Sequence, residues 1–307
     1  MTVSTIRPIQ LGNAFDVEPI GQGVNAFLVG PPLGLINAGH PTQVDALKAA
    51  IRQNGADASA IERIVCTSWA IDSVGGTRHF PRADVFLLSP DGRAPKTYRD
   101  WVDTQKAALE PYLKHTGADI STFFNAWFGA APSNLEFIPL SVGNSLMIGG
   151  MSFDVLPLHG FDEGACMLHA QPQSALFCSE LSLNGLPPDV RNAQAFLGDL
   201  DRAAATGAAN VYPTHGRPST RGEMDLRRAA RWANNLLSNA QHAMRGGVTL
   251  AGFVERDLGY PPEDPVEYAL RMHAIYPFLE ELVTSHVIEA AGEGFHRVYA
   301  TNIEPRV

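Results

Sequence analysis

Hydrophobic and polar positions along the chain predict a layered α/β protein that begins with strands around one helix. The runs VNAFLVG and GLINAG are short, apolar and joined at PPLG, which is typical of two strands and a turn. In PTQVDALKAAIRQNG, Val44, Leu47 and Ile51 recur at helical spacing and Gly55 follows the last turn. IERIVCTS and ADVFLLS then predict two buried strands. The expected order is strand, strand, helix, strand, strand.

Residues 98–132 have a helical pattern with an aromatic stripe. YRDWVDTQKAALEPYLKHTG and ISTFFNAWFGAA predict two helices, and Phe123, Phe124, Trp127 and Phe128 recur at i, i+1, i+4 and i+5. Such a stripe is typical of core packing. The alternative is that it forms the wall or lid of a pocket.

Strands return in the middle of the chain, and helices dominate its end. LEFIPLSVGNSLMIGGMSFDVLPL and SALFCSEL predict strands, PDVRNAQAFLGDLDRAAATG a helix, and NVYPTHG a strand and a turn. TRGEMDLRRAARWANNLLSNAQHAMRGG predicts a long helix, and the segment from DPVEYAL to VYATN predicts two helices and a short hairpin. We therefore expect an αββα sandwich of two mixed sheets over residues 1–220. A helical, winged-helix-like extension over residues 221–307 should pack on it.

Composition and charge narrow the classes of partner. Of 307 residues, 45% are apolar and 18% charged, which favours a sizeable buried core. The net charge of −9 disfavours nucleic acid and anionic membranes as partners, so the winged-helix-like part should serve packing or a homodimer. We expect no signal peptide and no membrane span, because long apolar runs are missing. Cys66, Cys166 and Cys178 have no CxxC spacing, which favours buried thiols and a cytoplasmic location.

The stretch CTSWAIDSVGG follows a β-branched strand and ends in paired glycines, as expected of a strand, a tight turn and a helix. With four other segments in order, it resembles the metallo-β-lactamase superfamily over about residues 18–220. The other segments are VNAFLVG with LINAGHP, FDVLPLHGFDEGACML, ALFCSEL and VYPTHGRP. The resemblance implies the superfamily's αββα fold. It does not imply the superfamily's chemistry, because the motif residues that bind metal are the ones that differ.

Most metal positions implied by the resemblance carry other residues here. Ser68, Ala70 and Phe161 stand where the three ligands of the first metal belong, and a neutral hydroxyl, a methyl and a phenyl group are no substitute for imidazoles. Ser73 stands where a histidine of the second site belongs. Asn37 replaces an aspartate that usually supports the metal ligands.

Three positions of the second metal site keep ligand-type side chains. Asp72 and His215 match a carboxylate and a histidine ligand, and Glu180 replaces the bridging aspartate. The resemblance implies that these residues share a cavity and hold at most one divalent ion, either iron, manganese or zinc, or no metal. Asp72 and His215 are then the candidate catalytic residues. The alternatives are a helix cap at Asp72 and a turn at His215, or a hydrolytic triad with Ser68, which no G-x-S-x-G turn supports.

Further candidates surround this set. His159 lies two residues before Phe161 and is a candidate substitute ligand, or a hydrogen-bonded turn histidine. Ser68, Trp69, Ser73 and Phe161 are the candidate substrate-binding residues, with Trp69 and Phe161 on the cavity wall.

Two functions follow from these residues. The first is an enzyme acting on a small molecule through a rebuilt, at most mononuclear site, by hydrolysis or iron–oxygen chemistry. The alternative is a metal-free, non-catalytic descendant of the fold that binds a ligand or a partner. The aromatic stripe and Trp69 favour an apolar ligand.

Overall fold

The computed structural model describes residues 5–12, 23–89, 98–162, 164–183, 190–258 and 263–301, and every strand and helix below lies in these ranges. The strands are β1 (Thr5–Gln10), β2 (Asn25–Gly30), β3 (Gly34–Ile36), β4 (Arg63–Cys66), β5 (Asp84–Leu88), β6 (Ile138–Leu140), β7 (Ser145–Ile148), β8 (Met151–Pro157), β9 (Cys166–Ala170), β10 (Ala175–Ser179), β11 (Asn210–Pro213), β12 (Val248–Thr249), β13 (Ile288–Ala291) and β14 (Val298–Thr301). The helices are α1 (Val44–Gln53), α2 (Ile71–Val74), α3 (Tyr98–Thr116), α4 (Ile120–Phe128), α5 (Ala193–Ala205), α6 (Gly222–Ala243), α7 (Leu250–Leu258) and α8 (Pro265–Thr284).

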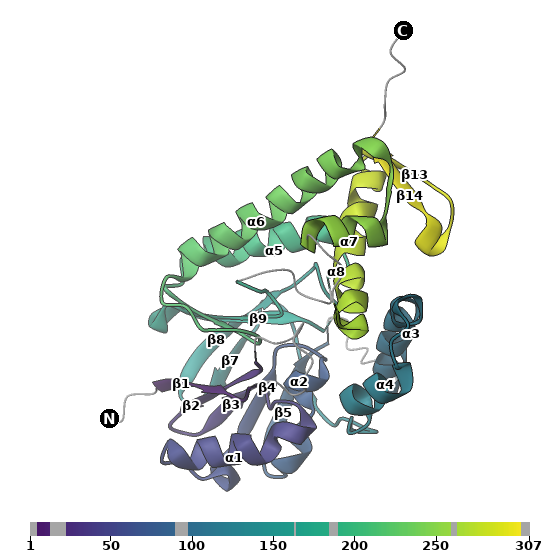
Figure 1. The fold of residues 1–307 in the computed structure, drawn as a ribbon. Coiled ribbons are helices and arrows are strands. Elements are labelled where there is room, and N and C mark those ends of the chain that lie inside the picture. Colours follow the sequence, from purple (N-terminus) through teal and green to yellow (C-terminus); the bar gives the residue numbers. More distant parts are fainter. Residues whose placement is uncertain are drawn as a thin grey trace.

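Two mixed sheets form the centre of the molecule (Figure 1). The first has the order β1-β2-β3-β4-β5-β6, antiparallel through β3 and parallel from β3 to β6. The second has the order β11-β10-β9-β8-β7, in which only β10 and β11 run parallel. Helix α1 lies below the first sheet, and α5 and α6 lie above the second. This arrangement confirms the predicted αββα sandwich.

Alternation along the strands explains the layers. In β2, Phe27 and Val29 belong to the cluster between the two sheets, whereas Ala26 and Leu28 belong to the cluster beneath the first sheet. Successive side chains of a strand point to opposite faces, so a strand covered on both sides needs apolar residues at every position. All six residues of β2 are buried, and its one polar side chain, Asn25, donates from Nδ2 to the carbonyl oxygens of Pro213 and Gly216.

Three strands were not predicted, namely β1, β9 and the two-residue β12. β1 reads TIRPIQ, has mostly exposed or half-buried residues and contains Pro8, which suits the edge strand that it is. β9 follows so closely on the GFDEG turn that the hydrophobic pattern does not separate the strand from the turn.

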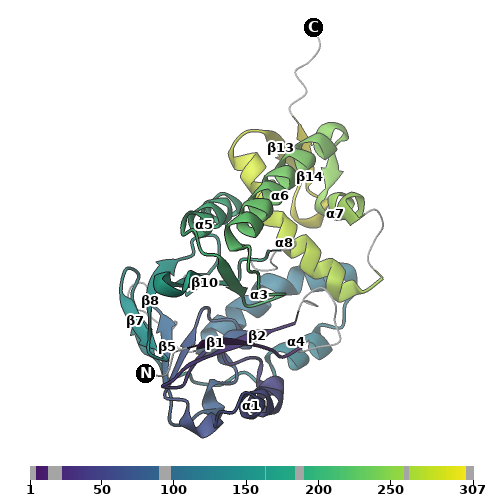
Figure 2. The same ribbon diagram turned by 90° about the vertical axis from the view of Figure 1, so that its left-hand side faces the viewer.

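The C-terminal region packs against the second sheet. Helix α6 is followed by β12, α7, α8 and the β13–β14 hairpin, and β12-β14-β13 form a third sheet, a winged-helix order of elements. The two helices predicted between DPVEYAL and the hairpin are one helix, α8, which continues through Pro277. One hydrophobic cluster joins Leu176 and Val211 of the second sheet to Phe278 and Tyr299. Figure 2 shows these elements stacked above the second sheet. The boundary at residue 220 stays a prediction.

The remaining expectations concern thiols and membranes. Cys66, Cys166 and Cys178 are buried and free, as predicted, and burial raises the pKa of Cys166 to about 12. Within the described ranges, no helix is both long and apolar enough to cross a membrane.

Candidate functional site

The candidate site forms where strands of both sheets end. Asn37 follows β3 and Ser68 follows β4, which are parallel neighbours in the first sheet. Glu180 follows β10 and His215 lies just beyond β11, which are parallel neighbours in the second sheet. Parallel strands end at the same edge, and loops beyond their carboxyl ends commonly form binding sites. Four segments far apart in sequence therefore meet at one edge of the sandwich.

The predicted strand, turn and helix of CTSWAIDSVGG are present as β4, a four-residue loop and the short α2. The two glycines after α2 have a steric reason. A Cβ on Gly76 would collide with the carbonyl oxygen of Ala38, and one on Gly75 with Pro41. Glycine thus lets this loop pack directly against the end of β3.

Asn37 ties three of the loops together. Its backbone has a φ of 58°, a conformation that asparagine tolerates better than most residues. Its Oδ1 accepts from the Thr67 amide at 2.9 Å and the Thr67 hydroxyl at 3.1 Å, and its Nδ2 donates to Thr214 Oγ1 at 3.1 Å. The resemblance implied that Asn37 replaces an aspartate that supports metal ligands. In this structure Asn37 instead connects the loops through hydrogen bonds.

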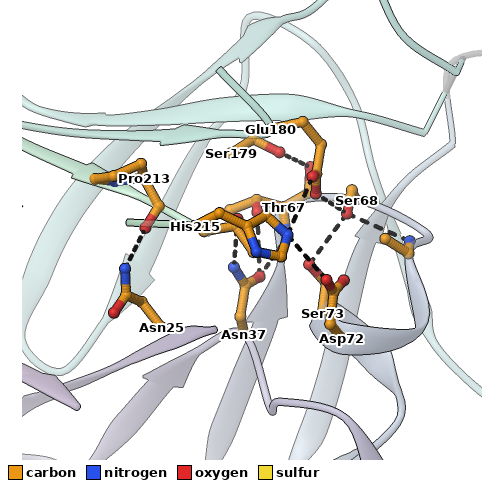
Figure 3. Close-up of polar contacts among 12 residues, drawn as sticks. Asn25, Asn37, Thr67, Ser68, Asp72, Ser73, Ser179, Glu180, Pro213 and His215 are labelled. Atoms are coloured by element: carbon orange, nitrogen blue, oxygen red, sulfur yellow. Dashed lines mark hydrogen bonds and ion pairs between the residues drawn. The ribbon is translucent and has the colours of Figure 1, made fainter. Parts of the chain in front are cut away.

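Asp72, Glu180 and His215 converge, as Figure 3 shows. His215 Nε2 lies 2.9 Å from Asp72 Oδ2 and 3.7 Å from Glu180 Oε2. The Ser68 hydroxyl donates to Glu180 Oε1 at 2.7 Å, and its oxygen lies 3.0 Å from Ser73 Oγ. We call these five residues the polar cluster. In it, two carboxylates from different layers face one imidazole.

The polar cluster is shielded from water. The exposed fractions of the side chains are 5% for Asp72, 9% for Glu180 and 15% for His215. Burial would raise the pKa of the Asp72 carboxyl, but the adjacent His215 imidazole and its hydrogen bond outweigh that effect and lower the pKa below its usual value. Asp72 Oδ1 is buried with no hydrogen-bond partner among the described residues. The cluster therefore holds an ionised carboxylate with one oxygen left for another partner.

A cavity opens beside the polar cluster. The volume open to the centres of water molecules is about 30 Å³. Its described lining is mostly aromatic or aliphatic, with the acid–imidazole set at one place. The lining residues are Ala70, Ile71, Asp72, Trp101, Gln105, Leu109, Phe123, Trp127, Phe128, Glu180, His215 and Leu270.

Three residues of the aromatic stripe line this cavity. Phe123, Trp127 and Phe128 line it, whereas Phe124 does not. For these three rings the alternative prediction, a pocket wall, is the one that the structure supports. Phe123 and Phe128 also belong to hydrophobic clusters, so the stripe takes part both in core packing and in the cavity wall.

Polar contacts hold the wall in place. His40 Nε2 lies 3.0 Å from the carbonyl oxygen of Trp127, which ties α4 to the segment after β3. Asp162 Oδ2 accepts from Gln105 at 2.6 Å and from the Trp101 indole at 3.2 Å, which ties α3 to the turn after β8. Both ties fix helices that supply cavity residues.

The two predicted wall residues, Trp69 and Phe161, both pack against other aromatic rings. Trp69 was expected on the cavity wall, but its indole donates to Leu88 O at 3.3 Å and packs against Tyr98 and the backbone of Gly164. Phe161, also expected on the wall, is buried against Phe196 of α5. Neither residue is among the described residues that line this cavity, and their place on a cavity wall stays a prediction.

The prediction that His159 substitutes for a metal ligand is not supported. The residue is exposed, and its backbone amide donates to Asp199 at 3.0 Å. It is not among the described residues that line the cavity. The alternative, a hydrogen-bonded turn histidine, agrees with this placement.

Several lining residues were not predicted as site residues, among them four on α3 and α8. Trp101, Gln105 and Leu109 lie one helical turn apart on α3 and so share a face. That spacing was a usable signal, but only if α3 had been placed over the strand ends. Leu270 comes from α8, and nothing in its own segment connects it to a loop about 200 residues earlier.

Comparison with known proteins identifies the fold. No protein-family model and no curated protein sequence matches this chain. Solved structures do match. A metallo-β-lactamase family protein from Thermus thermophilus has a TM-score of 0.75 at 18% identity, over 97% of this chain and 98% of that one. A β-lactamase domain protein from Burkholderia ambifaria has a TM-score of 0.71 at 15% identity, over 96% and 91%.

A third match covers less of the chain. An archaeal metallo-β-lactamase superfamily protein from Sulfolobus tokodaii has a TM-score of 0.53 at 15% identity, over 74% of this chain and 85% of that one. The chain has the metallo-β-lactamase fold. Because the first two matches cover nearly the whole chain, the similarity includes the C-terminal helices.

The positions at which the resemblance implied metal ligands carry few side chains that could bind a metal. At the first position, Ser68 is bonded to Glu180, Ala70 has no donor atom, and Phe161 is packed on Phe196. At the second, His215 Nε2 lies at hydrogen-bond distance from Asp72. Among the residues that the structure describes, no group of three or more His, Cys, Asp or Glu side chains is arranged to hold a metal ion. The residues present therefore do not fit the fold's two-metal centre.

Proposed function

We propose that this protein binds a small organic molecule in the cavity and does so without a metal. The observation that carries the proposal is the direct contact between His215 and Asp72 at the edge of an aromatic-walled cavity. Because His215 contacts Asp72 directly and Ser68 contacts Glu180, these side chains need no metal ion to hold them in place. Mostly apolar linings with a few convergent polar groups are typical of ligand sites.

The contacts of Ser68 favour binding over nucleophilic catalysis. A serine nucleophile needs its hydroxyl proton directed at a base that is itself free to accept it. Here the hydroxyl donates to Glu180, and His215 Nε2 faces Asp72. The composition of a Ser-His-Asp triad is present, but the contacts of a triad are not the ones observed.

The size of the cavity limits the ligand. A water site needs about 10–15 Å³ of such volume, so about 30 Å³ accommodates a few heavy atoms. The ligand is therefore a small molecule, or the small end of a larger one.

A fragment screen by ligand-observed NMR tests the proposal. We expect wild-type protein to bind small, partly apolar fragments with the same affinity before and after EDTA treatment. The variant Leu270→Trp fills the cavity from α8 and should lose this binding. Met224→Trp, on the exposed side of α6, is the matched control and should keep it.

Either of two results would overturn the proposal. Fragment binding that is equal in Leu270→Trp and wild type would place the ligand elsewhere. Fragment binding that appears only with one equivalent of iron, manganese or zinc would instead favour a mononuclear enzyme.

A further inference from the structure

A second pocket lies at the opposite end of strand β4 from the candidate site. The volume open to the centres of water molecules is about 260 Å³. Its described lining residues are Lys48, Ala58, Ser59, Ile61, His79, Phe80, Pro81 and Arg82. Ile61 precedes β4 and residues 80–82 precede β5, and these strands run parallel, so the pocket lies at their amino ends. The polar cluster lies at the carboxyl ends, and the pocket is therefore separate from the cavity of the proposed function.

The pocket is basic although the chain as a whole is acidic. The net charge of the chain is −9, yet Lys48 of α1 and Arg82 line the pocket, and no aspartate or glutamate is among its described lining residues. Burial, and then the charges of Arg78 and Lys48, lower the pKa of His79, so this imidazole is neutral at pH 7. The described lining side chains therefore carry two positive charges.

Both charges are available to a ligand. Neither the Lys48 nor the Arg82 side chain makes an ion pair or hydrogen bond with another residue in the described ranges. The charge of Asp57 acts on Arg82, but that carboxylate accepts from the Ser59 amide at 2.9 Å and the Ser59 hydroxyl at 2.7 Å. Neighbouring cations without a counter-charge attract anions.

The rest of the lining supplies an apolar surface and a hydrogen-bond donor. Ile61 and Phe80 are buried, and Lys48 Nζ lies 5.8 Å from the centroid of the Phe80 ring. His79 Nε2 accepts from Arg78 Nε at 3.2 Å, so the proton of the neutral ring is on Nδ1. The pocket thus combines cations with an apolar surface, as an organic anion requires.

We infer that this pocket binds the phosphate monoester of a small molecule. Arginine and lysine are the side chains that bind phosphate, arginine through two parallel hydrogen bonds. A phosphate monoester carries a charge of about −1.5 to −2 at pH 7, which matches the two cations. A carboxylate or a sulfate ester has only one negative charge and leaves one cation unmatched. The organic group of the monoester contacts Ile61 and Phe80.

Isothermal titration calorimetry at about pH 8, where a phosphate monoester is a dianion, tests this inference with three probes. Phenyl phosphate has the inferred chemistry, phenyl sulfate has the same shape with one negative charge, and inorganic phosphate lacks the ring. We expect phenyl phosphate to bind about tenfold more tightly than phenyl sulfate. It should also bind about tenfold more tightly than inorganic phosphate, because the ring is removed from water.

Variants connect this preference to the pocket. Lys48→Gln and Arg82→Gln each remove one charge and should weaken the binding of phenyl phosphate by about tenfold. Each should also reduce the preference over phenyl sulfate, because one cation remains. Arg245→Gln, at an exposed position after α6, is the matched control and should bind like wild type. Thermal melting checks that each variant is folded.

Three results would overturn the inference. Wild type that does not bind phenyl phosphate has no such site. Equal affinity for phenyl phosphate and phenyl sulfate would mean that the second charge is not recognised. Unchanged binding in both Lys48→Gln and Arg82→Gln would place the anion elsewhere on the molecule. None of these results bears on the proposed function, which the fragment screen tests at the other cavity.

Discussion

At the scale of single residues, the site depends on side chains that satisfy one another. Asn37 holds the loops after β4 and β11 with both ends of its amide, and Ser68 engages Glu180. Asp72 keeps its charge because His215 lies beside it. Each of these contacts joins segments that are distant in sequence. The positions of the loops therefore determine which polar groups meet in the site.

The contact between Asp72 and His215 makes a prediction for stability and its pH dependence. Because the folded-state pKa of Asp72 is lowered, the ionised carboxylate stabilises the fold above the unfolded value of about 3.8. This contribution is lost as the pH falls through the lower folded-state pKa. Asp72→Asn should therefore cost about 2 kcal/mol or more at pH 7.

Urea unfolding between pH 7 and pH 3 measures this difference. The gap in unfolding free energy between wild type and Asp72→Asn should narrow below about pH 4. A gap that stays constant over the whole range would mean that the carboxylate does not act through its charge.

Residue types and order in the sequence were enough to predict that Asp72, Glu180 and His215 come from the ends of strands. They were not enough to place side chains whose direction depends on packing. The Trp69 ring packs in the core against Tyr98 and Gly164, and both of these residues come from other segments of the chain. Phe161 is likewise directed by Phe196.

At the scale of elements, α4 is a short helix that supplies part of the cavity wall. It has only nine residues, and its Phe123 and Trp127 form part of the cavity wall. The Trp127 carbonyl oxygen accepts a hydrogen bond from His40 Nε2, which links α4 to the segment after β3. The predicted helix was correct in place but ends at Phe128, three residues earlier than predicted, and the sequence could not show which core its aromatic stripe would face.

His40 gives α4 a pH-dependent attachment. Burial lowers the pKa of His40 below 6.5, although the hydrogen bond to Trp127 and the charge of Asp72 oppose this. A lowered histidine pKa means that protonation favours the unfolded state, so stability is lost as the pH falls below 6.5. His40→Gln keeps a donor for Trp127 without a titrating group.

Urea unfolding at about pH 7.5, 6.5 and 5.5, around the ordinary histidine pKa, compares wild type with His40→Gln. The unfolding free energy of His40→Gln should fall less steeply over this range than that of wild type. His242→Gln, on α6 and exposed, should follow wild type. Parallel curves for His40→Gln and wild type would exclude His40 as the titrating group.

At the scale of the whole molecule, the C-terminal helices complete both the core and the cavity. Leu270 of α8 lines the cavity, and Phe278 of the same helix packs on Phe196 of α5 at 6.0 Å between ring centroids. The alternating pattern predicted the two sheets and their covering helices. It could not predict that α8 reaches the site, because helical periodicity defines a buried face but not its partner.

Phe278→Ala tests whether the sandwich and the C-terminal helices fold together. Phe278 is fully buried in the cluster that the two parts share. Its truncation should cost about 3–5 kcal/mol and lower the midpoint of a single calorimetric transition. Two transitions, only one of them shifted, would show that the parts fold independently.

The central claim is that a metallo-β-lactamase fold here carries a polar cluster that closes without a metal. Elemental analysis of protein purified without chelator tests it most directly, after dialysis against metal-free buffer. The account predicts well below one equivalent of zinc, iron and manganese together per chain, with the thermal midpoint unchanged by EDTA. One tightly held ion per chain, whose removal by EDTA lowers that midpoint, would contradict it.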